Sequence, residues 1–313
     1  PSPSEYLKLV NSSDSPGDIQ IDYVEILAPV YEQWPPASHT RIFISSTNTS
    51  DELKYAREVL TRFISRAWRR DVSDSEVDQK LTLFTRFRPE CDDFQEAMIE
   101  VLATVLSSPR FLYLVQAGPS TEPGDDSIND DSLSDYELAT RLSMFLWCST
   151  PDAELLDLAS KGRLSEPDVL GSQVERMLAD GRSRRFSKQF VRQWLGMELL
   201  DFLNVDRKTY PQFDSDLKEA MQEEPVAFFH EILQNNHSVM DFVHADFTMA
   251  NERLSRHYSL NGVYGNHFRK VLFSPENGRG GVLTQAGLLA MNSDGKDSHP
   301  LKRGIWLLES LLN

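Results

Sequence analysis

From residue 50 onward, apolar side chains recur every three or four residues along the chain. This spacing places them on one face of a helix, which can then pack against other helices. A Ser or Thr followed three residues later by Glu is the pattern of a capping box at a helix start, and it occurs at 49–52, 73–76 and 134–137. The sequence therefore predicts a mainly α protein.

The helical region is predicted to form two packed subdomains. Residues 37–116 hold three amphipathic helices joined by short linkers, which together make a compact bundle. Residues 117–132 are small and acidic and are typical of a solvated linker. A calcium loop is the alternative there, but the Gly and the terminal Glu of the EF-hand pattern are not at the required spacing. Residues 133–313 then form a larger helical domain.

Three features are expected inside the larger domain. Residues 214–234 have the pattern of one long helix that contains Pro225, so we expect this helix to be kinked, or split with Pro225 first in its second part. Residues 268–273 are predicted to form a short strand. An apolar helix at 279–291, a polar loop and a second helix that begins at Pro300 then close the domain.

The N-terminal segment has a different period. Residues 5–10 and 19–27 alternate apolar and polar side chains with turn-forming residues between them, which predicts a β-hairpin. Because an isolated hairpin is only marginally stable, we interpret residues 1–36 as the tail of a β-sandwich-like module that ends in a Trp34-Pro35-Pro36 connector. The chain begins with Pro-Ser-Pro rather than Met and carries no signal peptide, so we expect a processed or excised piece.

Charge and cysteine content exclude several classes of partner and cofactor. The chain carries 32 basic and 48 acidic side chains, a formal charge of −16, and this field repels nucleic acid and anionic membrane surfaces. No run of about 18 apolar residues is present, so no membrane insertion is expected. Cys91 and Cys148 form no CxxC or CxxCH motif, so no cofactor is expected in this chain. Their positions allow either one disulfide or two buried thiols.

No catalytic motif is present in the sequence. His230 precedes Glu231, but no second His follows at the spacing of a zinc-protease helix, so that class is excluded. The serine-nucleophile elbow and the phosphate-binding glycine loops are also missing. His244, Asp246 and His257 offer two imidazoles and a carboxylate to a metal, while the alternative is that His257 makes local hydrogen bonds on its helix. The sequence thus leaves open whether the chain is an enzyme, and it predicts no metal site.

A polar cluster is predicted at the start of one helix in the larger domain. It consists of Asn251, Glu252, Arg253 and His257. Charge-assisted hydrogen bonds from such groups tie a loop to the core of a protein. We therefore interpret this cluster as structural.

The final stretch contains the candidate ligand site. A basic residue and a glycine pair are predicted to open a helix there, and the free N–H groups at a helix start favour an anion. The loop and helix that follow carry further cationic groups. The predicted anion- or ligand-binding residues are Arg279, Gly280, Gly281, His299, Lys302 and Arg303. The alternative is that the glycines only permit a tight turn and close helix packing.

Several stretches of the chain, taken in order, resemble a known family. They are Ala56-Arg-Glu-Val-Leu-Thr-Arg-Phe with Ala67-Trp-Arg-Arg, Leu106-Ser-Ser-Pro-Arg-Phe-Leu-Tyr113, Leu133-Ser-Asp-Tyr-Glu-Leu-Ala-Thr-Arg-Leu-Ser-Met-Phe-Leu-Trp147, Gln193-Trp-Leu-Gly196, Asn251-Glu-Arg-Leu-Ser-Arg-His-Tyr258, and the closing Arg-Gly-Gly and Lys-Arg-Gly-Ile-Trp-Leu-Leu-Glu. These stretches resemble the large extracytoplasmic proteins of Planctomycetes and related bacteria that contain domain-of-unknown-function families 1592 and 1595. The similarity covers most of residues 50–313.

The resemblance implies a periplasmic or secreted multidomain protein, and it supplies no reaction. Family members often carry a c-type cytochrome domain upstream, and some carry a β-sandwich resembling a carbohydrate-binding module. Residues 19–34 are similar to the last strand of such a module and its exit. This chain lacks the haem-binding motif, so any haem would belong to the full-length protein or to a partner. It also stops at Asn313, where relatives continue into a proline-rich stretch and further domains.

Two functions are therefore expected. The first is a non-catalytic scaffold or binding module, associated with polysaccharide, whose partners are other domains or subunits of a larger assembly. The alternative is a part of an extracytoplasmic oxidoreductase that works with a c-type cytochrome. In that case Arg279, Lys302 and Arg303 would hold an anionic substrate or a haem propionate.

Overall fold

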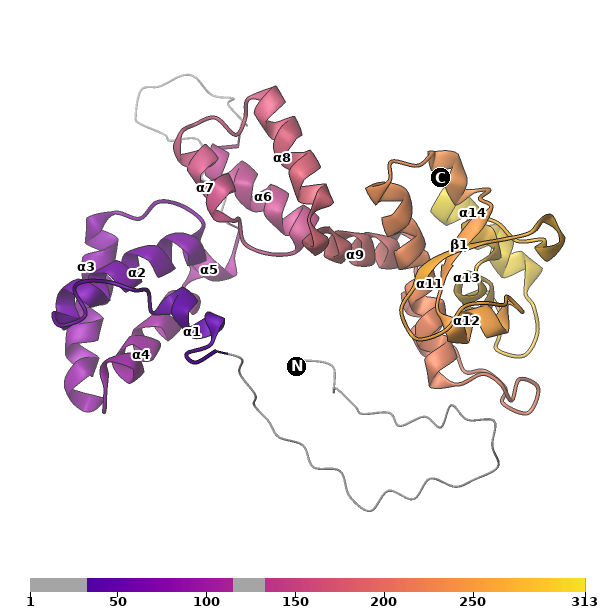
Figure 1. The fold of residues 1–313 in the computed structure, drawn as a ribbon, viewed down its shortest axis with the longest axis horizontal. Helices are drawn as coiled ribbons and strands as arrows, with labels where there is room; N and C mark the ends of the chain where they lie inside the picture. The colour runs from indigo at the N-terminus through magenta and orange to yellow at the C-terminus, as the bar shows by residue number, and fades with distance from the viewer. Residues whose placement is uncertain (1–32, 115–132, 313) are drawn as a thin grey trace, which may run out of the picture. The chain divides into compact units, whose positions relative to one another are not determined.

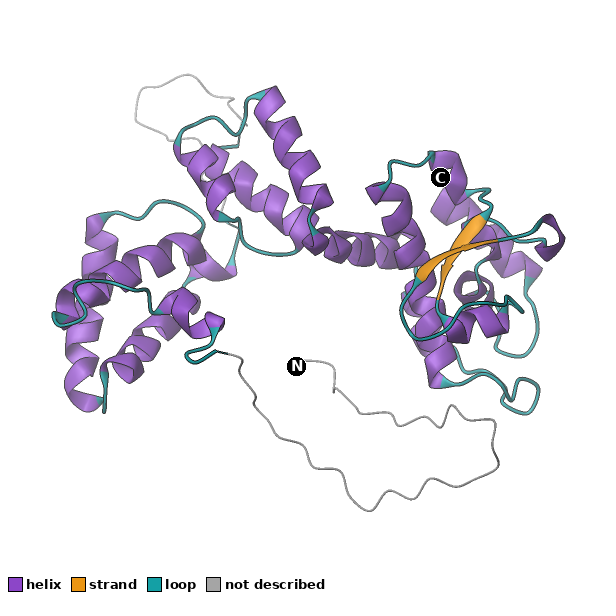
Figure 2. Cartoon of the chain, in the orientation of Figure 1, coloured by secondary structure: helices purple, strands orange, loops and turns teal. Residues whose placement is uncertain are grey.

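The structure, a computed structural model, describes residues 33–114 and 133–312. These residues are mainly helical, with one two-stranded antiparallel sheet, as Figure 2 shows. The mainly α fold expected from the sequence is confirmed. The predicted β-hairpin at 5–27 and the predicted linker at 117–132 lie outside the described residues. Internal contacts divide the described residues into two units, one ending at Tyr55 and the other beginning at Ala56.

The first unit contains α1 (Ala37–Ile42) and the start of α2 (Glu52–Trp68). Asp51, the residue before α2, accepts the backbone N–H of Lys54 at 3.2 Å and so caps the helix. The prediction that Thr49 caps this helix is therefore wrong. The helix begins at Glu52, and a carboxylate next to that start reaches the free N–H groups that a side chain three residues away does not.

The second unit begins with a helical group that contains the rest of α2, α3 (Asp74–Phe87), α4 (Phe94–Leu106) and α5 (Pro109–Leu112). Ser73 and Glu76 form the predicted capping box of α3. Buried Arg69, just after α2, donates from its guanidinium to three carbonyls around α5 at 3.0–3.1 Å. This contact fixes the end of α2 against the end of the group.

The next group contains α6 (Asp135–Trp147), α7 (Ala153–Ser160) and α8 (Pro167–Ala179). Its core surrounds Trp147, which is fully buried and donates from Nε1 to the Met177 carbonyl at 2.9 Å. The guanidinium of Arg182 lies 3.4 Å from the centroid of the same ring, so the indole is packed on its face and satisfied at its N–H. Ser134 and Glu137 form the predicted capping box that starts α6.

Helix α9 (Arg184–Trp194) connects this group to the C-terminal part of the chain. It packs against α6 and against α11 (Ser215–Gln234). Phe190 and Trp194 of α9 contact Phe229 of α11, with ring centroids 5.1 and 6.5 Å apart. Aromatic pairs at such distances add to the stabilisation from buried area.

The C-terminal part contains α10 (Glu198–Phe202), α11, β1 (Phe247–Ala250), α12 (Glu252–His257), β2 (Arg269–Leu272), α13 (Ala286–Met291) and α14 (Pro300–Leu311), drawn in orange and yellow in Figure 1. Helix α11 lies at its centre, and its buried face contacts β1, α12 and α13. The strands pair antiparallel, with Phe247 opposite Leu272 and Ala250 opposite Arg269. The strand predicted at 268–273 is therefore confirmed as β2, and the helix predicted at Pro300 as α14.

Helix α11 continues through Pro225 and is not split there. Proline has no N–H, so Pro225 cannot donate to the Met221 carbonyl one turn earlier. That carbonyl faces Gly287 of α13, where an added Cβ would lie 2.4 Å from the Met221 oxygen. The Met221 carbonyl, to which Pro225 donates no hydrogen bond, thus occupies the space that a side chain at residue 287 would need. Buried contacts on both sides of Pro225 hold the helix together in spite of the missing hydrogen bond.

Replacing Gly287 with alanine is expected to lower the free energy of unfolding by about 1–3 kcal/mol, because a backbone atom of α11 must move to admit the methyl group. Urea denaturation measures this change. Gly304→Ala on α14 is the matched control, since no atom lies within 4 Å of its added Cβ and alanine favours a helix by about 1 kcal/mol over glycine. Equal destabilisation by both changes would contradict the close approach.

Candidate functional site

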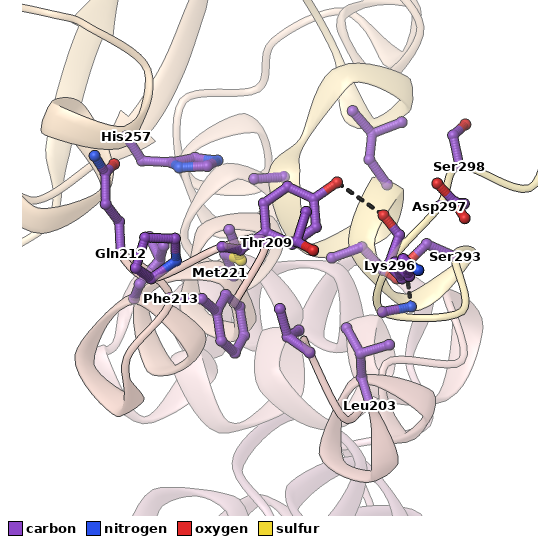
Figure 3. Close-up of a pocket in the computed structure, with 18 of the residues that line it drawn as sticks. Leu203, Thr209, Gln212, Phe213, Met221, His257, Ser293, Lys296, Asp297 and Ser298 are labelled. Atoms are coloured by element: carbon purple, nitrogen blue, oxygen red, sulfur yellow. Dashed lines mark hydrogen bonds between the residues drawn. The ribbon is translucent and has the colours of Figure 1, made fainter. Parts of the chain in front are cut away.

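A cavity of about 490 Å³ lies in the C-terminal part of the chain, next to α11. It is lined by residues of α11, α12, α13 and α14 and by two loops, at 203–213 and 293–298 (Figure 3). Its volume falls within the range of about 300–1,000 Å³ that is usual for small-molecule sites. The lining combines apolar side chains with a few cationic and polar ones, which is also typical of such sites.

The two loops that border the cavity are joined to each other. Asp206 donates its backbone N–H to the Gly295 carbonyl at 3.0 Å, and the Tyr210 hydroxyl donates to the Lys296 carbonyl at 2.9 Å. Gly295 has a φ of 86° and lies against the Asn204 carbonyl, where an added Cβ would approach the oxygen to 2.1 Å. Glycine is needed at this position both for its backbone conformation and for the contact. The loops therefore form one wall.

Arg279 reaches the cavity wall from the segment before α13. Its guanidinium donates from one nitrogen to the Thr284 carbonyl at 2.8 Å and lies 4.1 Å from the centroid of the Tyr258 ring. Within the described residues it makes no ion pair. Because an arginine carries five N–H donors in a planar fork, most of them stay available to a ligand.

Arg303, in the first turns of α14, also lines the cavity. Its Nε is buried and has no hydrogen-bond partner within the described residues, and its guanidinium forms no ion pair there. An unsatisfied buried donor is costly, and a charged one more so. Because Nε itself is closed off from solvent, a group in the cavity would contact other atoms of this guanidinium.

His257, the last residue of α12, contributes an imidazole to the same lining (Figure 3). Burial by the surrounding protein lowers the pKa of His257, and the positive charges of Arg279 and Arg253 lower it further. The ring is therefore neutral at neutral pH. A neutral imidazole can donate one hydrogen bond and accept another.

Glu224, on the buried face of α11, is fully enclosed by protein. Its carboxyl accepts hydrogen bonds from the Thr248 hydroxyl at 2.7 Å and the Tyr258 hydroxyl at 2.6 Å, and the Tyr258 oxygen accepts the Ala286 N–H at 2.7 Å. Burial raises the pKa of Glu224 to about 7, although both hydroxyls and the positive charge of Arg279 act to lower it. This network joins α11, β1, α12 and α13, and through the Tyr258 ring it also supports Arg279.

The sequence analysis missed Glu224, although a signal was present. Leu217, Met221 and Phe228 mark the apolar face of α11, and Glu224 falls on that same face at helical spacing. A carboxylate in an apolar stripe is expected either to be paired or to have a raised pKa. The carboxylate within this apolar stripe therefore indicates a buried acid.

The predicted anion-binding residues are only partly brought together. Arg279 and Arg303 both line the cavity. Gly280 and Gly281 do not, because they pack against backbone atoms of 242–245, as in the alternative of close packing. They precede a short 3-10 turn, and α13 begins only at residue 286, so the apolar helix predicted at 279–291 is shorter than expected.

The other two predicted residues lie outside the lining. His299 is the residue before α14, and Lys302 is exposed with its Nζ 3.4 Å from the Ser293 carbonyl. Lys296, which the sequence analysis did not select, lines the cavity instead. Lys302 and Arg303 are consecutive residues on α14, and consecutive side chains on a helix point to different faces. Lys302 therefore lies away from the face that Arg303 presents to the cavity.

The predicted polar cluster surrounds the start of α12. Asn251 caps the helix by accepting the Leu254 N–H at 3.0 Å. Glu252 accepts the Gly265 N–H at 2.7 Å, and Arg253 donates to the Asp214 carboxylate at 3.2–3.3 Å. These three side chains attach neighbouring loops to α12. His257 makes no side-chain hydrogen bond within the described residues and faces the cavity instead.

Other candidate chemistry is not assembled in the part of the chain that the structure describes. No three His, Cys, Asp or Glu side chains there gather as metal ligands. Cys91 and Cys148 are free thiols, the first half-buried and the second exposed. Each helix at 33–114 and 133–312 is too short or too polar to span a bilayer.

Two segments of the chain match known family models. Residues 133–260 match the family described as PSD4: Protein of unknown function (DUF1592), and residues 55–116 match PSD5: Protein of unknown function (DUF1595). Both families expected from the sequence thus have a model that matches part of the chain. No curated protein and no solved structure matches the chain.

The wild-type protein is expected to lose stability as the pH rises, and replacing Glu224 with glutamine is expected to abolish that loss. The folded protein keeps this proton up to pH of about 7, whereas the unfolded chain loses it near the ordinary value of 4.5, so stability falls as the pH rises between them. The contribution is on the order of 3 kcal/mol. Urea denaturation at pH 5 and pH 8 measures it as the difference between wild type and variant. Glu219→Gln, an exposed change on the same helix, should keep the wild-type pH dependence; a Glu224→Gln curve parallel to wild type would refute the assignment.

Replacing Tyr258 with phenylalanine is expected to destabilise the protein strongly. The change leaves the Ala286 N–H and one Glu224 oxygen buried without a partner, at a cost of about 1–3 kcal/mol for each group. The midpoint of chemical denaturation measures the loss. Tyr264→Phe removes a hydroxyl from a side chain that is 73% exposed and should have little effect. Similar midpoints for the two variants would show that the network does not hold α13.

Proposed function

We propose that this chain is a binding module of a larger extracytoplasmic protein, and that the cavity at Arg279 and Arg303 holds a small anionic molecule. One observation carries the proposal. Arg279 and Arg303, which form no ion pair within the described residues, both line one cavity. A bound anion would accept charge-assisted hydrogen bonds from their guanidinium groups.

Arg279 and Arg303 are among the arginines that form no ion pair within the described residues. Other arginines pair with carboxylates, as Arg176 does with Asp152 at 2.8 Å and Arg182 does with Asp180 at 2.7 Å, whereas buried Arg69 is satisfied by backbone carbonyls. With 48 acidic against 32 basic side chains, partners are plentiful. Two unpaired guanidinium groups in a cavity are therefore what a site for an external anion requires.

The groups in the cavity are suited to holding a ligand. Two guanidinium groups and a neutral imidazole supply hydrogen bonds and charge, and apolar side chains supply the remaining surface. The oxidoreductase alternative depends on a cytochrome domain outside this chain and on Lys302, which does not line the cavity. Binding is the function that this geometry supports best.

The location of the module follows from the resemblance rather than from the cavity. Matches at 55–116 and 133–260 support the two families, and the extracytoplasmic placement extends from the family resemblance to this chain. Other domains or subunits of the assembly, and a polysaccharide to which it attaches, are the partners that this placement suggests. The proposed ligand site does not depend on them.

Acetate and phosphate are expected to stabilise the wild-type protein more than chloride does at equal ionic strength. At tenfold excess over its Kd, a bound anion adds about 1.4 kcal/mol, which raises the Tm by roughly 2–4 °C. Arg279→Gln and Arg303→Gln should each reduce the increase, because each removes one cation from the wall. Thermal unfolding followed by circular dichroism measures the shifts.

Arg207→Gln is the matched control for this experiment. Arg207 is exposed in the loop beside the cavity and does not line it, so the change removes the same charge without touching the site. The control should keep the wild-type response to acetate and phosphate. Identical responses in all three variants would mean that the anions act on the general charge of the protein, and the proposed site would be wrong.

A further inference from the structure

The cavity is far larger than an inorganic anion requires. Its volume is about 490 Å³, while a water molecule takes up about 30 Å³ in the liquid. Cavities of this size hold organic molecules and bury most of their surface. The ligand is therefore expected to have a body beyond its charged group.

The surface available to such a body is apolar. Leu203, Phe213, Leu217, Met221 and Leu289 all line the cavity. In Figure 3, Phe213 and Met221 lie between His257 at the upper left and Lys296 at the right, and Leu203 lies below Lys296. Contact with these side chains removes apolar ligand surface from water, which stabilises the complex. An inorganic anion would gain nothing from them.

The charges in the wall favour an anionic head on the ligand. Arg279 and Arg303 each offer a planar fork that matches the two oxygens of a carboxylate. Lys296 and Asp297 also line the cavity, and their opposite charges offset each other, so the two arginines supply the net charge that a ligand meets. A planar carboxylate held by these forks meets this condition.

We infer that the cavity takes an amphipathic monocarboxylate, with its carboxylate at Arg279 and Arg303 and its apolar body along Leu203 and Met221. This inference rests on the proposed function, because it names the class of anion that the module binds. The apolar body is a short alkyl chain or an aromatic ring. Both offer an apolar surface to the side chains of the cavity.

The test compares five probes on the full chain by isothermal titration calorimetry: acetate, octanoate, 3-phenylpropanoate, octanol and octyl phosphate. Octanoate or 3-phenylpropanoate is expected to bind about tenfold or more tightly than acetate, because each buried methylene adds affinity. Octanol and octyl phosphate are expected to bind more weakly than octanoate. The order of octanoate and 3-phenylpropanoate then identifies the body that fits.

Two variants separate the head of the ligand from its body. Leu203→Asn should weaken octanoate about tenfold and leave acetate unchanged, since it alters only the apolar wall. Leu199→Asn is the matched control, because Leu199 is 55% exposed and does not line the cavity. Arg303→Gln should weaken both carboxylates. Thermal melts check that each variant is folded. If Leu203→Asn does not fold, the ratio of octanoate to acetate affinity in the wild-type protein and the effect of Arg303→Gln test the inference instead.

The failures of the two proposals are distinguishable. Equal affinity for acetate and octanoate, both dependent on Arg303, would overturn the inference and leave the anion site in place. Octanol as tight as octanoate, or octyl phosphate tighter, would overturn the carboxylate head. If none of the anions bound, the proposed function would fail together with the inference.

Discussion

The buried hydrogen-bond network around Tyr258 determines the shape of the C-terminal part of the chain. The Tyr258 hydroxyl lies between the Glu224 carboxyl of α11 and the Ala286 N–H that starts α13, so one oxygen fixes the distance between two helices. The same ring carries the Arg279 guanidinium on its face. Because a buried carboxyl that loses its partner is costly, the network resists rearrangement and keeps Arg279 at the wall. The position of Arg279 thus depends on how one buried acid is satisfied.

Local sequence patterns predicted the helices well because their determinants lie within a few residues. The capping boxes of Ser73 and Ser134 and the start of α14 at Pro300 needed only neighbours in the chain. The continuous helix through Pro225 did not follow from such patterns. There the cost of a missing N–H is set against buried contacts on both sides of the proline, and those contacts come from segments distant in sequence, including Gly287.

The candidate site was predicted less well for the same reason. Arg279 and Arg303 were selected because they flank the closing loop, but the grouping assumed that a glycine pair opens a long helix. In the structure those glycines serve close packing, and His257 enters from a segment more than twenty residues earlier. Sequence can identify cationic residues in an acidic chain; which of them face one cavity depends on the tertiary contacts of α11 with α12 and α13.

The match to the first family model ends at residue 260, and this boundary runs through the cavity. Leu203, Phe213 and His257 lie within the matched segment, whereas Arg279 and Arg303 lie beyond it. Most of the apolar wall and the imidazole therefore lie in the segment that matches the family model, and Leu289 and the cations lie in the part that follows.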